Sequence, residues 1–203
     1  MTPQAPPVRL RLLAEPPAWP EGRPAAVLVS LWPPAHPEAV DEPRDPAFSP
    51  AWRLLYILRG DTGGKHDGQV AFPGGALEPG DAGPVAAALR EAREELSLET
   101  SHLAVQGFLT PLAIPVSGFA VTPVVALGDR REPALRDAPG EVSGHFFVAL
   151  QTLRAVRGQE PFVRAGRLTR FPVFTLPGAE GLDAPVRIWG ATAWITANFL
   201  DRL

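Results

Sequence analysis

The chain has 203 residues and a mass of 21.7 kDa, a length typical of one domain, and 45% of its residues are hydrophobic. Its 19 basic and 22 acidic residues give a net charge of -3, which excludes binding of nucleic acid or anionic membranes through overall charge. There is no cysteine, which excludes disulfides and thiolate metal sites, while 25 prolines and 19 glycines exclude a bundle of long helices.

The amino-terminal residues lack the basic start and apolar stretch of a secretory signal, and no run of about 18 apolar residues occurs anywhere. We therefore expect a cytoplasmic protein with no nucleic-acid or membrane partner. Residues 1–24 are rich in proline and are expected to form an arm on a single domain that covers 25–203. Its apolar residues would pack on that domain, namely Leu10, Leu12, Leu13 and Trp19. No feature of the sequence sets an oligomeric state.

The first half of the domain predicts strands followed by a helix. The apolar segments 25–32 and 52–59 are bounded by breakers and predict two strands that pair. Residues 33–51, which include six prolines, are expected to form a long loop inserted between these strands. A strand at 69–72 would lead into a turn at Pro73-Gly74-Gly75. Residues 84–96 predict a helix, with Asp81 as its N-cap and Pro84 in its first turn.

The second half mixes strands with two further helices. We expect strands at 102–109, 119–127, 145–148 and 186–189, a hairpin within 162–176, and helices at 150–156 and 191–203. A charged loop is expected over 128–139. This mixture predicts an α/β or α+β fold.

The predicted helix at 84–96 is amphipathic. At about 100° per residue, its apolar residues fall on one arc that would face the sheet, namely Val85, Ala88, Leu89, Ala92 and Leu96. Glu91, Glu94 and Glu95 fall on the adjacent arc, where they repel one another, and Arg90 is in register to pair with Glu94. Such an arc is either a solvated acidic face or a cation site, because Mg²⁺ and Mn²⁺ prefer carboxylate oxygens.

The residues around this helix form a recognisable pattern. Gly74-Gly75 precedes a helix that carries Arg90-Glu91-Ala92-Arg93-Glu94-Glu95-Leu96. This pattern resembles the Nudix box, Gly-x5-Glu-x7-Arg-Glu-U-x-Glu-Glu-x-Gly-U with U aliphatic, and matches its Arg-Glu-x-x-Glu-Glu part at every fixed position. The segment from Gly75 to Arg90 is one residue longer than in the box and lacks its first glutamate, and Ser97 replaces the closing glycine.

The extra residue resembles the coenzyme A pyrophosphatase branch of the Nudix family, whose upstream motif ends in His-x-Gly-Gln-Val-x-Phe-Pro-Gly-Gly. Here the matching segment is His66-Asp67-Gly68-Gln69-Val70-Ala71-Phe72-Pro73-Gly74-Gly75. Three later segments are also similar, Ser117-Gly118-Phe119-Ala120-Val121-Thr122-Pro123, Gly140-Glu141-Val142 and Trp189-Gly190-Ala191-Thr192-Ala193. Gly60, Gly63 and Gly64 replace a serine and a Leu-Arg pair of the family, so Lys65 or a more distant arginine would supply the missing charge.

The resemblance implies a Nudix α/β/α sandwich with a mixed β-sheet, and a site on the 84–96 helix. Glu91, Glu94 and Glu95 would hold Mg²⁺ or Mn²⁺ with the main-chain carbonyl of Gly75 or Gly74, and Arg90 would tie Glu94 in place. Glu91 belongs to the implied catalytic set, and the general base would be Glu94 or Glu141. The implied substrate contacts are Lys65, His66, Gly68, Gln69, Phe72 and Gly74.

The implied reaction is metal-dependent hydrolysis of the diphosphate linkage in coenzyme A or its derivatives, a small nucleotide substrate, to 3',5'-ADP and 4'-phosphopantetheine. The alternatives are the same chemistry on another nucleoside diphosphate derivative, such as ADP-ribose or a dinucleotide, and a Nudix-fold module that binds without catalysis. The complete Arg90 to Glu95 signature favours an enzyme, because a binding module has no need to keep three repelling carboxylates. Among the tryptophans, Trp189 and Trp194 are expected in the core, and Trp32 or Trp52 could stack on adenine if either borders the cleft.

Overall fold

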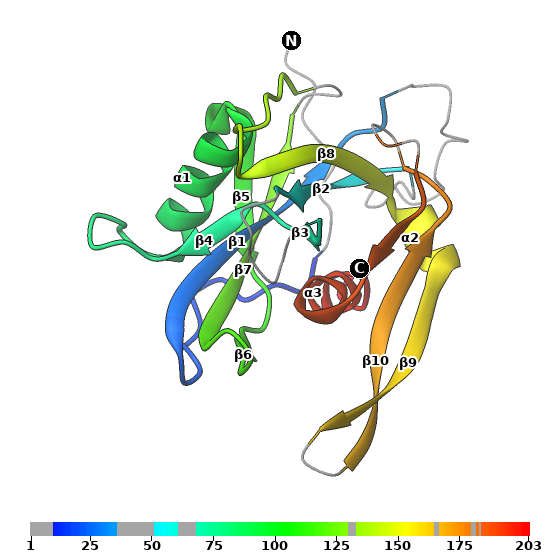
Figure 1. Cartoon of the computed structure of the whole chain (residues 1–203). Helices are drawn as coiled ribbons and strands as arrows, with labels where there is room; N and C mark the ends of the chain where they lie inside the picture. The colour runs from blue at the N-terminus through cyan, green and yellow to red at the C-terminus, as the bar shows by residue number, and fades with distance from the viewer. Residues whose placement is uncertain are drawn as a thin grey trace.

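A computed structural model describes residues 10–35, 51–60, 68–129, 133–164, 167–179, 182 and 184–203. Within these ranges the chain forms two β-sheets and three α-helices (Figure 1). None of the helices so described is long and apolar enough to cross a membrane. Residues 36–50 of the expected insertion, and Lys65 and His66 of the expected site, lie outside the described residues.

The larger sheet is mixed, as the sequence predicts. β1 (Arg23–Trp32) pairs in parallel with β7 (Phe119–Gly128) and antiparallel with β2 (Arg53–Arg59). The strand order is β3-β2-β1-β7-β5, with β3 at Val70–Ala71 and β5 at Leu103–Phe108. Three more strands join it: β4 (Gly74–Ala76) pairs with β1, β6 (Leu112–Ile114) with β7, and β8 (Val142–Ala149) with β2.

A smaller antiparallel sheet follows in the chain and was not predicted as a separate layer. Its order is β11-β10-β9, with bounds Val186–Ile188, Arg167–Leu176 and Arg157–Arg164. The short helix α2 (Leu150–Val156) connects β8 to β9. In Figure 1 the β9–β10 hairpin projects beside α3 (Gly190–Leu200), which packs against β10.

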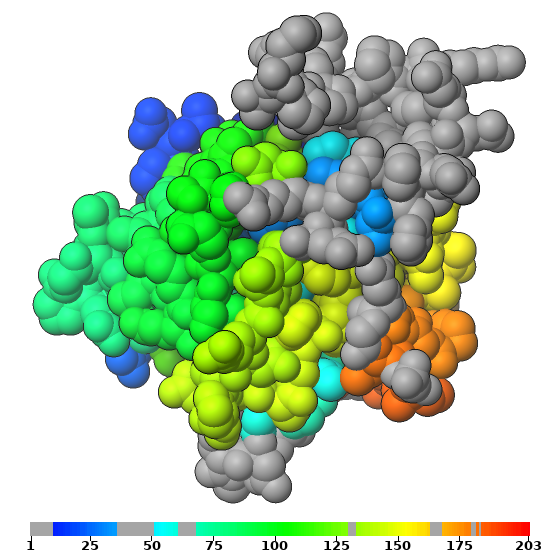
Figure 2. Space-filling model, turned by 90° about the horizontal axis from the view of Figure 1, so that it is seen from above, coloured from blue at the N-terminus to red at the C-terminus, as the bar shows by residue number. Residues whose placement is uncertain are grey.

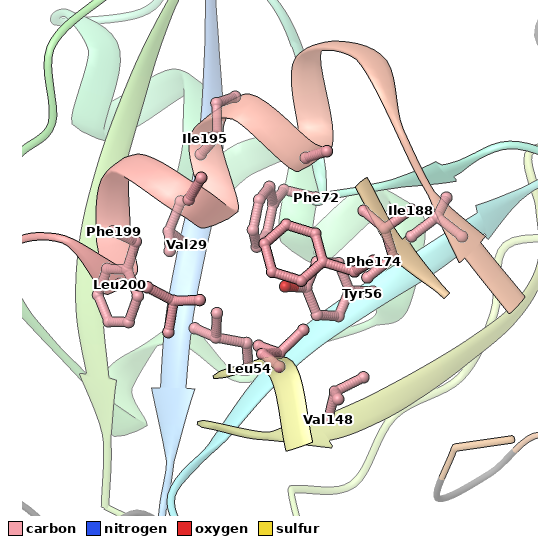
Figure 3. Close-up of a cluster of buried hydrophobic side chains, with 14 of the residues drawn as sticks. Val29, Leu54, Tyr56, Phe72, Val148, Phe174, Ile188, Ile195, Phe199 and Leu200 are labelled. Atoms are coloured by element: carbon pink, nitrogen blue, oxygen red, sulfur yellow. The ribbon is translucent and has the colours of Figure 1, made fainter. Parts of the chain in front are cut away.

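The two long helices cover opposite faces of the larger sheet. α1 (Pro84–Leu96) packs on β1, β4 and β7, and α3 lies on the other face. Successive residues of the central strands alternate between the two cores: Val29 and Leu31 pack on the α3 side, and Leu28 and Trp32 on the α1 side. Figure 3 shows the α3-side cluster around Tyr56, where side chains from both sheets and from α3 meet. This layering is the α/β/α arrangement expected from the sequence.

The bounds of α1 agree with the predicted helix, but its N-cap differs. The cap is Gly83, with no side-chain hydrogen bond, and Pro84 occupies the first turn. Asp81 instead accepts a hydrogen bond from the Glu78 amide, at 2.9 Å, and binds Arg90. The helix ends at Ser97, which adopts a left-handed conformation with φ of 52° where the family pattern has glycine. The N-cap prediction is therefore wrong, because the long-range pairing with Arg90 takes the Asp81 carboxylate.

Apart from the hairpin, the predicted strands and helices agree with the structure to within about three residues, and the last helix ends at Leu200 instead of at 203. The helix at 150–156 is confirmed at both ends, and the expected hairpin begins earlier, at Arg157. Two short strands, β4 and β6, were not predicted, and Gly74-Gly75 lies in β4 rather than in a turn. A two- or three-residue strand exists only through its partner, so no local periodicity marks it.

The amino-terminal arm contacts the core on the α3 side and the backbone of β5. Leu10 and Leu12 pack against that core, and Leu13 exchanges two backbone hydrogen bonds with Phe108, at 3.0 and 2.9 Å. Gly107 makes this approach possible, since a Cβ there would lie 2.5 Å from the Leu13 carbonyl oxygen. Leu13 itself remains 39% exposed.

Candidate active site

Two glutamates of α1 meet the backbone of β4. The Gly74 amide donates a hydrogen bond to Glu95 Oε2 at 2.9 Å. A Cβ at position 75 would overlap the Glu91 carboxylate, and one at position 74 would overlap the Ala26 carbonyl, where φ is also +153°. Each glycine is therefore required by close approach, Gly74 to β1 and Gly75 to a site carboxylate. The glycine pair predicted to be functional does lie against the acidic arc of the helix.

Glu95 is the buried carboxyl of the site, with 6% of its surface exposed. Burial, together with the negative charges of Glu91 and Glu141, raises its pKa to about 7, although the Gly74 amide and the Arg59 charge oppose the shift. The amide and the single positive charge near Glu95 do not offset the cost of burying its carboxylate close to two other acids. The environment therefore favours either a proton or a cation at Glu95.

Arg90 joins the rest of the acidic arc into one network. Its guanidinium donates to both carboxylate oxygens of Asp81, at 3.2 and 3.0 Å, and to the Ala76 carbonyl at 3.1 Å. It also donates to Glu91 Oε1 at 3.0 Å and to Glu94 Oε2 at 2.9 Å. The bidentate contact lowers the pKa of Asp81 and, with the glutamates, raises the pKa of Arg90. The Arg90–Glu94 pair expected from the sequence forms, and Asp81 is a partner that spacing did not predict.

The acidic residues differ in how they could serve a metal ion. Glu94 is 54% exposed and paired with Arg90, whereas Glu91 and Glu95 face β4. In the described part of the chain, no three His, Asp or Glu side chains come together in a metal-holding group. The expected metal site formed by Glu91, Glu94 and Glu95 therefore stays a prediction. Hard carboxylate oxygens beside the Gly74-Gly75 backbone do have the donor chemistry that Mg²⁺ or Mn²⁺ prefers, and Glu91 and Glu95 supply it.

Glu141 lies on a segment that is attached to the end of α1. The amides of Arg136 and Ala138 donate to the carbonyls of Leu96 and Glu95, both at 2.8 Å, and Figure 2 shows this segment lying against α1. The Gly60 amide donates to the Glu141 carbonyl at 2.7 Å. These bonds hold the exposed Glu141 near the buried Glu95.

The same segment explains one of the departures from the family pattern. A Cβ at position 60 would lie 2.5 Å from the Gly140 carbonyl oxygen, so Gly60 is needed where the end of β2 meets this segment. Asp137 Oδ1 lies 2.6 Å from His145 Nδ1, which ties the segment to β8 as well. The sequence analysis did not find this pair, because the two residues belong to different elements and follow no periodic spacing.

Among the expected substrate contacts that the structure describes, Gly68 and Gln69 are at least partly exposed, whereas Phe72 is buried. Gly68, with φ of 69°, lies two residues before β3, and its amide donates to the Arg59 carbonyl at 2.9 Å. Gln69, the next residue, is half-buried. Phe72 is 2% exposed and packs 4.8 Å from the Tyr56 ring, so we correct its role from substrate contact to core residue.

Of the predictions made for the tryptophans, the one for Trp194 agrees with the structure and those for Trp32, Trp52 and Trp189 do not. Trp32 and Trp52 are buried, with 0% and 7% of their surfaces exposed, so neither can stack on adenine. Trp189, expected in the core, is 49% exposed, while Trp194 packs partly buried against the core. Trp189 precedes the first turn of α3, where burial depends on which elements cover the turn rather than on the residue type.

Arg59 is the residue whose role the sequence analysis missed. The expected source of positive charge was Lys65 or a more distant arginine. Arg59 ends β2, its carbonyl accepts from the Gly68 amide, and its positive charge opposes the rise in the pKa of Glu95. Its position at the end of the predicted strand at 52–59 was the available signal, but the direction of its side chain could not be read from the sequence.

The comparison with known families identifies the class of protein. The model of the Nudix domain matches residues 47–166, which include β2 to β9 and all of α1. The chain therefore belongs to the Nudix hydrolase family. A MutT/nudix family protein from Enterococcus faecalis superposes with a TM-score of 0.50 at 15% identity, covering 93% of this chain and 64% of that one, which supports the fold.

Comparison with individual proteins gives more specific similarities than the family model does. The chain is 37% identical over 153 residues to the mitochondrial coenzyme A diphosphatase NUDT8 of Homo sapiens, covering 74% of this chain and 62% of the human protein. It is 35% identical to the Mus musculus protein of the same name, covering 70% of that protein. An uncharacterized Nudix hydrolase, NudL of Escherichia coli, is 48% identical over 86 residues, covering 42% of this chain and 44% of that one.

Proposed function

We propose that this protein hydrolyses the diphosphate linkage of coenzyme A or a derivative, releasing 3',5'-ADP and a 4'-phosphopantetheine product. The observation that carries the proposal is the placement of buried Glu95 and half-buried Glu91 against the Gly74-Gly75 backbone. Keeping a buried carboxyl beside two further acids costs stability, and the cost is offset when a cation binds. The substrate is supported by the motif from His66 to Gly75 and by the relatives named as coenzyme A diphosphatases.

Each residue of the candidate site has its own role in the proposed reaction. Glu91 and Glu95 would hold Mg²⁺ or Mn²⁺, which when bound supplies charge neutralisation and a more acidic water. Arg90 holds Glu91 and Glu94 in place, because its guanidinium is already committed to Asp81 and Ala76. Arg59, exposed at the end of β2, would contact a phosphate of the substrate.

Of the two candidates for the general base, the geometry favours Glu141. The Glu94 carboxylate is engaged by Arg90 at 2.9 Å. Glu141 is exposed, its backbone is fixed to Gly60 and Ala138, and its charge acts on Glu95. It therefore lies where a carboxylate could accept a proton from a water beside the site. Glu141→Gln should lower turnover more than Glu94→Gln if this assignment is correct.

The test of the proposed function is product analysis by chromatography. The purified protein is incubated with coenzyme A, ADP-ribose, NADH and ATP, each with Mg²⁺ and with EDTA. We expect 3',5'-ADP from coenzyme A with Mg²⁺ alone. Cleavage of ADP-ribose with survival of coenzyme A would show that ADP-ribose, and not coenzyme A, is the substrate. If no compound is cleaved, the result would favour a binding module.

A further inference from the structure

A cavity of about 380 Å³ opens beside α3 and is not part of the site described above. One wall is β6 with the turn that follows it, the other is the β9–β10 hairpin, and the start of α3 closes the end. Figure 1 shows β6 on one side of α3 and the hairpin on the other. Its lining includes Ile114, Val116, Phe162, Phe171 and Trp189. The volume is in the range of small-molecule sites, roughly 300–1,000 Å³.

The lining is apolar and stays in contact with solvent. Val116 is 95% exposed, Phe162 50% and Trp189 49%, which makes them three of the most exposed large apolar residues in the described chain. The Phe162 and Phe171 rings pack at 5.3 Å between centroids, which gives the hairpin wall a rigid aromatic surface. Exposed apolar side chains gathered around a concave surface are typical of a binding site.

The charges at this cavity select against a charged occupant. Its two charged lining residues, Glu160 and Arg187, form an ion pair with each other. A phosphate or carboxylate would have to break this pair to gain a partner, and an amide or nucleobase would lose hydrogen bonds to water. A neutral aliphatic group has neither cost and gains from leaving water. The cavity therefore complements an uncharged hydrocarbon.

The start of α3 and the turn after β6 each connect to a segment close to Gly74 and Gly75 of β4. In the first turn of α3, the Thr192 hydroxyl donates to the Val70 carbonyl at 2.9 Å, and Val70 lies four residues before Gly74, at most about 14 Å of extended chain. In the turn after β6, the Gly118 carbonyl accepts from the Arg23 amide at 2.8 Å, and the next residue after Arg23, Pro24, accepts from the Leu77 amide at 3.0 Å. A long substrate held at its diphosphate could thus reach the cavity.

We propose that this cavity receives the acyl chain of an acylated coenzyme A, so that acyl thioesters are preferred to free coenzyme A. This inference rests on the proposed function. Of the parts of such a substrate, the nucleotide and the diphosphate are charged and the pantetheine arm carries amides. The acyl chain alone has no hydrogen-bonding demand, which matches a cavity whose charged residues pair with each other.

The test is a series of substrates with increasing chain length. Initial rates are measured with Mg²⁺ for coenzyme A and its butanoyl, hexanoyl, octanoyl and decanoyl thioesters. Because each buried methylene contributes about 0.8 kcal/mol, kcat/KM should rise by up to about fourfold per added methylene until the cavity is filled. The rise should come from KM, since the chain lies away from the reacting phosphorus.

Two variants and a matched control locate the effect. Val116→Ser and Trp189→Ala should each reduce the ratio of kcat/KM for octanoyl-CoA to that for coenzyme A by about tenfold or more. Val105→Ser changes a valine that is 38% exposed on β5, outside the lining, and should leave the ratio unchanged. Thermal unfolding of each variant confirms that it is folded.

The possible failures are distinguishable. Hydrolysis of coenzyme A with no dependence on chain length would overturn the acyl assignment and leave the proposed function intact, whereas no hydrolysis of any thioester or of coenzyme A would remove the function itself. Calorimetric binding of sodium decanoate combined with a flat series would assign the cavity to a free fatty acid. Sedimentation of the parent as a dimer and of Trp189→Ala as a monomer would show that a second copy covers the cavity. Both last results would overturn the proposal.

Discussion

The helices α1 and α3 cover opposite faces of one sheet, yet only α1 carries ionised groups inward. After the first turn of α1, its buried apolar residues lie along one stripe, Ala87, Ala88, Ala92 and Leu96, and the buried Glu95 and half-buried Glu91 lie beside it. The buried residues of α3 surround its axis, namely Ala193, Ile195, Thr196, Ala197, Phe199 and Leu200. α3 is enclosed because the larger sheet covers it on one side and β10 on another.

The difference shows that α1 carries the candidate active site, whereas α3 stabilises the fold. A helix covered by a single sheet keeps an edge where a strand backbone and carboxylates can meet, as Gly74 and Glu95 do. A helix covered by two sheets has mainly its ends available for contact with a ligand or solvent. The solvent-exposed feature of α3 is accordingly at its start, where Trp189 and the apolar cavity lie. The comparison predicts that changes on α1 alter activity, whereas changes inside α3 alter stability.

The largest effect is expected at the buried acid of α1. Glu95→Gln should lower kcat by at least about a hundredfold in the presence of Mg²⁺, because a neutral amide cannot replace a charged metal ligand. The measurement is steady-state hydrolysis of coenzyme A. The matched control is Glu21→Gln on the exposed arm, which should keep the parental rate; an unchanged rate for Glu95→Gln would remove this residue from the metal site.

The raised pKa of Glu95 predicts a pH-dependent stability without metal. In the folded protein this pKa is about 7 instead of 4.5, so the folded state keeps a proton that the unfolded chain releases. The stabilisation is complete below pH 4.5 and is lost as the pH rises through 7, by at most about 3 kcal/mol. Urea unfolding in EDTA between pH 5 and about 8 measures it. Glu95→Gln should flatten the profile over this range, and a profile as steep as that of the parent would contradict the assignment.

The close approach of β4 to α1 can be tested at one glycine. Gly75→Ala places a methyl group against the Glu91 carboxylate and should lower kcat/KM about tenfold to a hundredfold by displacing it. Gly80→Ala is the control, because a Cβ there meets no atom within 4 Å. Equal activity of the two variants would show that Glu91 need not contact β4.

Inside α3 the expected effect is smaller and confined to stability. Tyr56 Oη and Thr196 Oγ1 lie 3.0 Å apart, and Tyr56 is the donor, because Thr196 gives its own hydrogen to the Thr192 carbonyl. Thr196→Val should cost about 1–2 kcal/mol of unfolding free energy by leaving the buried Tyr56 hydroxyl without an acceptor, while kcat stays within about twofold.

A double-mutant cycle isolates that hydrogen bond. Combining Thr196→Val with Tyr56→Phe should restore part of the loss, because neither polar group of the pair then remains buried alone. Denaturant unfolding of the four proteins gives the coupling energy. Strict additivity would show that the two side chains do not interact. A large loss of kcat in Thr196→Val would show that the inside of α3 also contributes to activity.

Agreement between sequence and structure is best where the signal is local. The bounds of α1, the paired Arg90 and Glu94, and the acidic arc all follow from the spacing of residues along one helix. The match to the Nudix box adds the glycine pair, which the structure does place beside that arc. Each of these features depends on residues that are close in the chain or on a fixed pattern.

What the sequence by itself determined is a mixed α/β domain of the Nudix family, with a helix that carries an acidic row. Only the tertiary structure decided that Glu95 is buried against Gly74, that Asp81 binds Arg90 instead of capping α1, and that Phe72 lies in the core while Trp189 is exposed. The physical reason is that helix periodicity and caps are set by neighbours in the chain, whereas burial and carboxylate partners are set by segments that meet only on folding.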